Sequence, residues 1–338
     1  MSSKDFIVHH DGALGDVILS LPVIHGIYVD NKPCHIRFIG RYPAISLLRF
    51  TDLPHVAVSS DLSLFANLYT ENGYKIPAVK EYFKTFKGGV IFSHNYSSPL
   101  FLNIARLIPH VRVIRTIPPP QEHKHVTDYQ LSQLAKNNNQ NNQLIIDLER
   151  DSSYGFIPEN IDREIVGIHP GSGGRKKCWP TSYFVQLMRL ITNWLSCKFV
   201  LFAGPAEEGL INDFKALYSH QNLQDDIVFV ENQQIDVVAS LLSRCSLYIG
   251  NDSGITHLAA LTAKRVIVLF GPTNPEVWAP MGEHVKVIQS NYSCAPCNEE
   301  NYKNCKNQKC LSELSVSKVW EETESFLSNT NCLLKGPV

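Results

Sequence analysis

The residues best suited to chemistry lie in a short polar stretch, GNDSG at 250–254, between an apolar run at 247–249 and a helix-like pattern. The first turn of a helix has four backbone N–H groups without intrahelical partners, at the positive end of the helix dipole. With Asp252 or Ser253 as the cap and Gly254 allowing close approach, this turn can hold a phosphate. The alternative is an ordinary capped core helix, because Asp and Ser are common N-caps.

A second candidate is the glycine-rich turn at 170–174, which contains Ser172 and is followed by the cations Arg175, Lys176 and Lys177. It comes directly after a buried-strand run. A diphosphate leaving group needs nearby backbone N–H groups and positive charge, and this segment supplies both. The alternative is a solvated basic loop.

A third candidate is Asp16, at the junction between a glycine-containing loop at 10–15 and a helix-like apolar stripe at 16–28. A carboxylate held in this position can act as a general base that removes a proton from a hydroxyl group. The alternative is an N-cap, whose carboxylate complements the helix dipole. The two roles are compatible.

Four cysteines follow one another closely: Cys294, Cys297, Cys305 and Cys310. Thiolates in this number can form a tetrahedral site for zinc or iron, which would be structural. The alternative is a loop with reduced cysteines. No Asp-x-Asp pair, a pattern that holds catalytic divalent ions, follows a suitable strand, so we expect catalysis to require no metal cofactor.

The elements that must position these residues alternate between strand-like and helix-like segments, which predicts parallel α/β sheets. Residues 246–280 read as a complete β-α-β unit. The other predicted strands are at 6–9, 35–40, 89–93, 111–116, 144–148, 165–169, 199–204 and 227–230, with helices near 16–28, 42–50, 100–107 and 316–327. The polar tract at 136–143 predicts an exposed loop, and the linker is expected within 149–163.

The chain of 338 residues is long for one core and favours two domains. Hydrophobic residues make up 44% and charged residues 19%, and the formal net charge of −1 gives no indication of a nucleic-acid partner. No apolar run is long enough to span a bilayer, and the first residues lack the features of a signal peptide. We therefore expect a cytoplasmic location with mostly free thiols.

The motifs closely resemble those of glycosyltransferase family 9, the ADP-heptose:lipopolysaccharide heptosyltransferases. The resemblance is strongest in GALGDVILSLP at 12–22, in the segment at 167–180 that contains Lys177, Trp179 and Pro180, and in the segment at 250–280. It implies a GT-B fold, an α/β architecture in which two Rossmann-like domains face a central cleft. The expected domains are 1–155 for the acceptor and 160–315 for the nucleotide sugar, followed by a C-terminal helix and tail at 316–338.

The implied activity is inverting, metal-independent transfer of heptose from ADP-heptose to the lipopolysaccharide inner core, with possible peripheral contact at the cytoplasmic face of the inner membrane. Asp16 matches the proposed catalytic base. The expected donor-binding residues are Ser172, Lys177, Glu231, Asp252, Ser253, Gly254 and His257. The expected acceptor-binding residues are His10, Gly15, His123 and His125. Related autotransporter heptosyltransferases carry an iron-binding cysteine finger, with a different spacing.

Three other functions remain open on the sequence. One is a transferase of the same fold that uses another nucleotide sugar or a protein acceptor. Another is a nucleotide-sugar epimerase, which would need an acid and base pair near the sugar rather than Asp16 alone. The third is a non-catalytic nucleotide-binding module, which the presence of both Asp16 and Lys177 disfavours.

Overall fold

The computed structural model describes residues 4–32, 34–95, 97–134, 162–219 and 226–328. The chain divides into two compact units, Met1–Asp147 and Leu148–Val338. The strand predicted at 144–148, the polar tract at 136–143 and most of the predicted linker at 149–163 lie outside the described residues.

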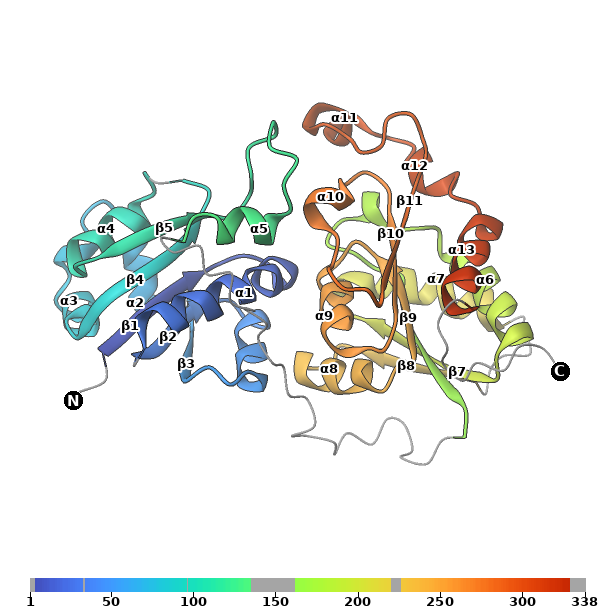
Figure 1. Cartoon of the computed structure of the whole chain (residues 1–338), viewed down its shortest axis with the longest axis horizontal. Helices are drawn as coiled ribbons and strands as arrows, with labels where there is room; N and C mark the ends of the chain where they lie inside the picture. The colour runs from blue at the N-terminus through green and yellow to red at the C-terminus, as the bar shows by residue number, and fades with distance from the viewer. Residues whose placement is uncertain (1–3, 33, 96, 135–161, 220–225, 329–338) are drawn as a thin grey trace. The chain divides into compact units, whose positions relative to one another are not determined.

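The N-terminal unit contains a five-stranded parallel sheet in the order β3-β2-β1-β4-β5 (Figure 1). Its strands are β1 Lys4–His10, β2 Cys34–Gly40, β3 His55–Ser59, β4 Phe86–Ser93 and β5 Val111–Arg115. Its α-helices are α1 Leu14–Asn31, α2 Ser63–Ala66, α3 Pro77–Phe83, α4 Pro99–Leu107 and α5 Val126–Leu131. The helix predicted at 42–50 is a 3-10 helix, η1 Ala44–Phe50, and β3, α2 and α3 were not predicted.

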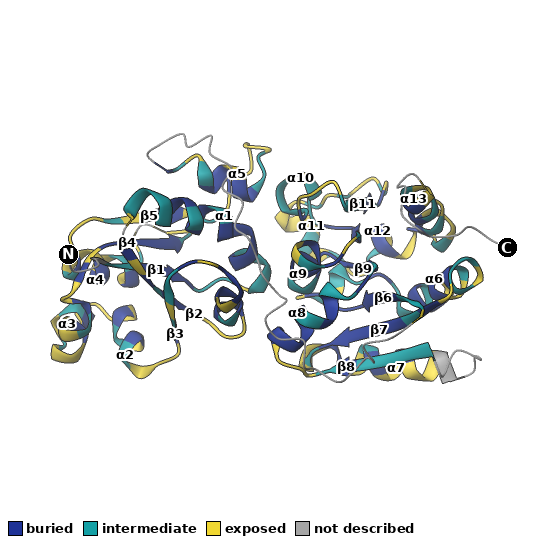
Figure 2. Ribbon diagram, turned by 60° about the horizontal axis from the view of Figure 1, so that its bottom comes forward, coloured by how far each residue is buried: buried dark blue, intermediate teal, exposed yellow. Residues whose placement is uncertain are grey.

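The central strand β1 is buried on both faces. Its successive side chains point alternately to the two faces of the sheet, and an apolar cluster covers each face. Ile7 packs in one apolar cluster with Phe65 and Phe83, and Val8 packs in another with Val17 and Ile24. Figure 2 shows the resulting burial of the inner strands between the covering helices. Polar side chains can therefore reach solvent only at the strand ends.

The C-terminal unit contains a six-stranded parallel sheet in the order β11-β10-β9-β6-β7-β8. Its strands are β6 Glu164–His169, β7 Cys197–Ala203, β8 Ile227–Glu231, β9 Leu247–Asn251, β10 Val266–Phe270 and β11 Val285–Gln289. Its α-helices are α6 Thr181–Trp194, α7 Glu208–Ser219, α8 Ile235–Ser243, α9 Gly254–Thr262, α10 Pro275–Trp278, α11 Glu299–Asn304, α12 Lys309–Ser312 and α13 Val316–Ser328. The predicted β-α-β unit is confirmed as β9-α9-β10, whereas β11 and α10 to α12 were not predicted.

Each sheet has one point where the order of strands reverses, between β1 and β4 in the first unit and between β6 and β9 in the second. In parallel α/β sheets, the connections on the two sides of such a point diverge and leave a crevice at the carboxyl ends of the strands. Ligand sites are therefore expected after His10 and Ser93 in the first unit, and after His169 and Asn251 in the second. In the described part of the chain, no helix is long and apolar enough to cross a membrane.

Candidate active site

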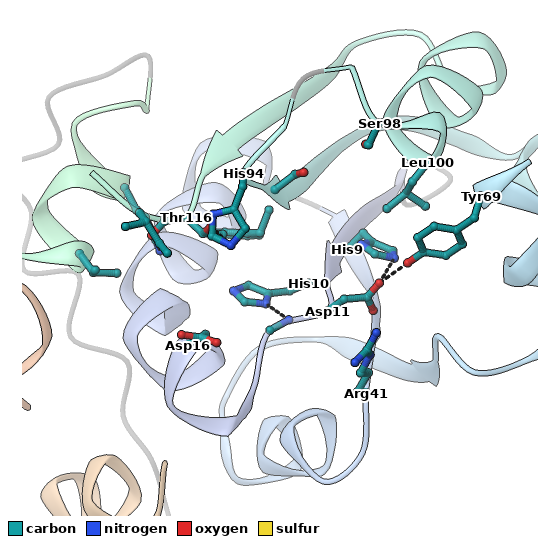
Figure 3. Close-up of a pocket in the computed structure, with 16 residues that line it drawn as sticks. His9, His10, Asp11, Asp16, Arg41, Tyr69, His94, Ser98, Leu100 and Thr116 are labelled. Atoms are coloured by element: carbon teal, nitrogen blue, oxygen red, sulfur yellow. Dashed lines mark hydrogen bonds and ion pairs between the residues drawn. The ribbon is translucent and has the colours of Figure 1, made fainter. Parts of the chain in front are cut away.

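A cavity of about 340 Å³ lies in the N-terminal unit at the carboxyl ends of β1, β4 and β5. Figure 3 shows its polar side chains, which come from segments far apart in the sequence. The residues that line it are His9, His10, Asp11, Gly12, Asp16, Arg41, Tyr69, Phe92, Ser93, His94, Ser98, Leu100, Thr116, Ile117, Val126 and Gln130.

Asp16 is the third residue of α1, which begins two residues before the predicted start. Its Oδ2 accepts a hydrogen bond of 2.9 Å from the backbone N–H of Ala13. The carboxylate therefore satisfies one of the unpaired donors of the first helical turn while it lines the cavity. The predicted position of Asp16 at the junction of loop and helix is confirmed, and its role as the base stays a prediction.

A polar cluster deeper in the cavity was not predicted. The Nε2 of buried His9 lies 3.4 Å from Asp11 Oδ2, and the hydroxyl of Tyr69 donates a hydrogen bond to the same carboxylate oxygen. Burial favours a raised pKa for Asp11, but His9, hydrogen bonds from Tyr69 and Ser60, and Arg41 lower it overall. Asp11 thus stays ionised and is held by these partners. No local spacing pattern connects Asp11 with Tyr69, because they are 58 residues apart.

The predicted acceptor residues have different surroundings. Both ring nitrogens of His10 form hydrogen bonds, with Ser20 and with Gly12, and Gly15 lies in the first turn of α1. His125 is the N-cap of α5, where its Nδ1 accepts from the Thr127 N–H at 3.3 Å.

His123 is exposed in the segment before α5. From α5 itself, Val126 and Gln130 line the cavity. Contact of either His123 or His125 with an acceptor stays a prediction.

The C-terminal unit brings three residues together around Asp252: the predicted Lys177 and Ser172, and Thr273. Lys177 Nζ lies 3.1 Å from Asp252 Oδ2, and Thr273 Oγ1 donates to the same oxygen at 2.7 Å. Ser172 Oγ donates to the backbone carbonyl of Asp252 at 2.6 Å. The glycine-rich turn, the start of α9 and the segment after β10 therefore meet at one residue, Asp252.

The start of α9 is capped by Ser253, whose Oγ accepts from the Thr256 N–H at 3.2 Å. His169 Nδ1 lies 3.2 Å from the same Oγ. Burial lowers the pKa of the His169 imidazole to about 4, so the ring is neutral at physiological pH. His257 is buried on α9, with 5% of its surface exposed. The N-terminal end of α9 thus has a fixed geometry beside Gly254.

Asn251 was not predicted as a site residue, although it fixes the glycine-rich turn. Its side chain is completely buried: Oδ1 accepts from the backbone N–H of Trp179 at 2.9 Å, and Nδ2 donates to the Pro170 carbonyl at 2.8 Å. Both ends of segment 170–179 are therefore attached to β9. The signal that could have identified Asn251 is a polar residue at the end of an otherwise apolar strand run.

Lys176 and Glu231 form hydrogen bonds outside the group of residues around Asp252. Lys176 Nζ donates to the backbone carbonyls of Tyr302 at 2.7 Å and Lys303 at 2.9 Å. Glu231, at the carboxyl end of β8, accepts from Lys215 Nζ at 2.6 Å. Contact of Glu231 with the donor stays a prediction.

The four cysteines at 294–310 influence one another electrostatically. Burial, followed by the neighbouring thiols Cys297, Cys294 and Cys305, raises the pKa of Cys310 to about 11. Burial and Cys294 likewise raise the pKa of Cys297. Within the described ranges, no three His, Cys, Asp or Glu side chains are arranged as metal ligands. Metal binding by these cysteines stays a prediction.

Comparison with known proteins identifies one family. The model described as glycosyltransferase family 9 (heptosyltransferase) matches residues 115–309, more than half of the chain. Lipooligosaccharide heptosyltransferase 2 of Campylobacter jejuni is 30% identical over 174 residues, which cover 50% of this chain and 53% of that protein. Lipopolysaccharide heptosyltransferase 2 of Salmonella typhimurium is 25% identical over 129 residues, covering 38% and 37%. The matched region thus spans about half or less of these relatives.

Two solved structures share the fold along almost the whole chain. ADP-heptose lipopolysaccharide heptosyltransferase II of Escherichia coli has a TM-score of 0.73 at 18% identity, covering 96% of this chain and 98% of that chain. A family 9 glycosyltransferase of Veillonella parvula has a TM-score of 0.72 at 17% identity, covering 98% and 99%. The predicted GT-B type fold is confirmed.

The buried, neutral His169 predicts a pH-dependent stability. Its pKa is about 4 in the folded protein and about 6.5 in the unfolded chain, so the unfolded state binds more protons in this window. The free energy of unfolding should therefore fall as the pH drops from about 6.5 to about 4, by about 3 kcal/mol from this residue. Denaturant unfolding of wild type and His169→Asn across this range should give a shallower dependence in the variant. The exposed control His123→Asn should keep the wild-type slope, and equal slopes in all three would contradict the assignment.

If the four cysteines form the tetrahedral thiolate site, protein purified without chelator should contain about one equivalent of zinc or iron, because such a site binds one ion. Elemental analysis measures it. Cys294→Ser with Cys297→Ser should abolish the metal, whereas the buried cysteine change Cys245→Ser should keep it. Metal-free wild-type protein would show that the cysteines are reduced thiols without a metal.

Proposed function

Because the chain belongs to glycosyltransferase family 9, we propose that it is a glycosyltransferase that moves heptose from ADP-heptose to the lipopolysaccharide inner core, with inversion and without a metal ion. The observation that carries the proposal is the position of Asp16, in the first turn of α1 and on the wall of the cavity at the carboxyl ends of β1, β4 and β5. The names of the Campylobacter and Escherichia relatives support the choice of acceptor and donor.

In the proposed reaction, an acceptor hydroxyl in the N-terminal unit attacks the anomeric carbon of the donor. The new C–O bond forms on the face opposite the diphosphate, the bond from the anomeric carbon to the phosphate oxygen breaks, and ADP leaves. The hydroxyl proton passes to the carboxylate of Asp16. The Ala13 N–H bond to Oδ2 holds that carboxylate in one orientation, which lowers the cost of reaching the reactive geometry.

We propose that the diphosphate binds at Lys177 and the start of α9. Lys177 is partly exposed, with 22% of its side-chain surface accessible, and the ion pair with Asp252 orients its ammonium group. The backbone N–H groups at Ser253–Gly254 carry the positive end of the helix dipole. Together they supply positive charge for the leaving group, the task that a metal ion performs in other transferases.

The acceptor in this proposal is attached to a lipid, so the enzyme would meet it at the cytoplasmic face of the inner membrane through peripheral contact. Binding of the sugar part is assigned to the cavity of the N-terminal unit. Its lining combines a carboxylate pair, histidines and hydroxyl groups, which suits a ligand rich in hydroxyls.

We predict that Asp16→Asn lowers kcat for ADP release by roughly 10²- to 10⁴-fold, because the amide cannot accept the proton. The substituted side chain still accepts the Ala13 N–H, so the melting temperature should change little. The assay contains ADP-heptose and a heptose-deficient core acceptor, with and without a chelator. Asp30→Asn, near the other end of α1, is the matched control and should retain full activity.

Each alternative has its own outcome in that assay. Release of nucleotide only with another nucleotide sugar would show that this other nucleotide sugar is the donor. Conversion of the sugar without an acceptor would indicate an epimerase, and full activity of Asp16→Asn would remove the assigned base. Loss of turnover with chelator would contradict metal independence.

We also predict that Lys177→Gln weakens ADP binding by roughly 10- to 100-fold, since a hydrogen bond to a charged group contributes about 1.5–3 kcal/mol. Calorimetric titration with ADP measures this without any acceptor. Lys264→Gln, an exposed lysine after α9, should bind ADP as the wild type does. Equal affinity of both variants would place the diphosphate elsewhere.

A further inference from the structure

His10 ends β1 immediately before the loop that leads to Asp16, and it is the residue around which this loop is packed. Only 1% of its surface is exposed. Its ring lies against Phe92 of the neighbouring strand β4, with ring centroids 4.7 Å apart and an interplanar angle of 33°. Figure 3 shows His10 on the same side of the cavity as Asp16.

Both nitrogens of the ring have partners, and these partners determine its tautomer. The backbone N–H of Gly12 donates to Nδ1 at 3.0 Å, so Nδ1 carries no proton. Ser20 Oγ donates to the Asp16 carbonyl at 2.8 Å, so it can accept from the Nε2–H of His10 at 3.0 Å. Burial, followed by His9, lowers the pKa of His10 to about 3, which agrees with this neutral form.

Two series of hydrogen bonds connect His10 with Asp16. One connects His10 to the loop at Gly12, next to Ala13, whose N–H holds the Asp16 carboxylate. The other runs through Ser20 to the Asp16 backbone.

The space around Gly12 in this loop is already occupied by neighbouring side chains. A methyl group built on Gly12 would lie 2.5 Å from His10 Cε1 and 2.7 Å from Asp16 Cβ. A shift of the His10 ring therefore displaces the segment that orients the carboxylate.

We propose that His10 is a positioning residue for the base: it acts through Gly12 and Ser20 to hold the Asp16 carboxylate in its reactive orientation. This inference rests on the proposed function. It differs from the direct acceptor contact expected from the sequence, because an acceptor hydroxyl could bind a ring nitrogen only after one of these bonds broke.

Three variants separate packing from hydrogen bonding. His10→Phe keeps a ring against Phe92 but removes both nitrogens. His10→Asn offers an amide oxygen in place of Nδ1 for the Gly12 N–H. Ser20→Ala removes only the connection to the Asp16 backbone.

We expect His10→Phe to lower kcat roughly 10- to 100-fold with little change in the KM for the donor, as small displacements of catalytic groups have effects of this size. His10→Asn should recover part of the loss, and Ser20→Ala should show a smaller loss. In the Asp16→Asn background, His10→Phe should cause little further loss, because the two residues act as a unit. A purely structural role would instead give the same fold-loss in both backgrounds, and this result, or wild-type kcat in His10→Phe, would overturn the inference.

A second measurement does not depend on turnover. Amide hydrogen exchange of the segment 11–16 should be about tenfold faster in His10→Phe than in wild type, whichever donor the enzyme uses, and unchanged exchange would overturn the inference. Failure of wild type to use ADP-heptose would contradict the proposed function alone. If His10→Phe does not fold, His10→Asn and Ser20→Ala are judged by the same two measurements.

Discussion

The structure depends on the fact that both sheets are parallel throughout and covered on both faces. Side chains along such strands must be apolar, and polar groups are restricted to the ends of the strands. A reversal of strand order favours a crevice at the carboxyl ends of the strands, and in the N-terminal unit a cavity lies there. Asp16 follows β1 and Asp252 follows β9, so the two carboxylates predicted from the sequence lie beyond strands that flank the reversal in each unit.

In both sites, a buried polar side chain is satisfied by hydrogen bonds to the segments packed around it. His10 and Asn251 are nearly or completely inaccessible, and each connects strand to loop through both ends of its polar group. A buried polar group without partners is costly, so these connections favour one loop conformation over others. Asp16 and Lys177, for which chemistry is proposed, are more accessible than His10 and Asn251.

Much of the fold could be predicted from the sequence. The buried strands of a parallel sheet appear in the sequence as continuous apolar runs, and glycine or polar turns follow them. The β9-α9-β10 unit and the position of Asp16 were predicted on this basis. β3 and β11 were missed, since edge strands such as His55–Ser59 are only partly buried and lack such a run. The contact of Asp11 with Tyr69 and that of Lys177 with Asp252 join distant segments, and local patterns carry no information about such pairs.

The attachment of the glycine-rich turn has a consequence for folding. Asn251 binds the Pro170 carbonyl across a separation of 81 residues, since β7 and β8 come between β6 and β9 in the chain but not in the sheet. Closing so long a loop has an entropic cost that local contacts do not offset. The turn beside Lys177 therefore acquires its shape only after the fourth strand of its unit has docked. A nascent chain that ends before residue 247 would contain the basic segment without the Asn251 side chain that orders the turn beside it.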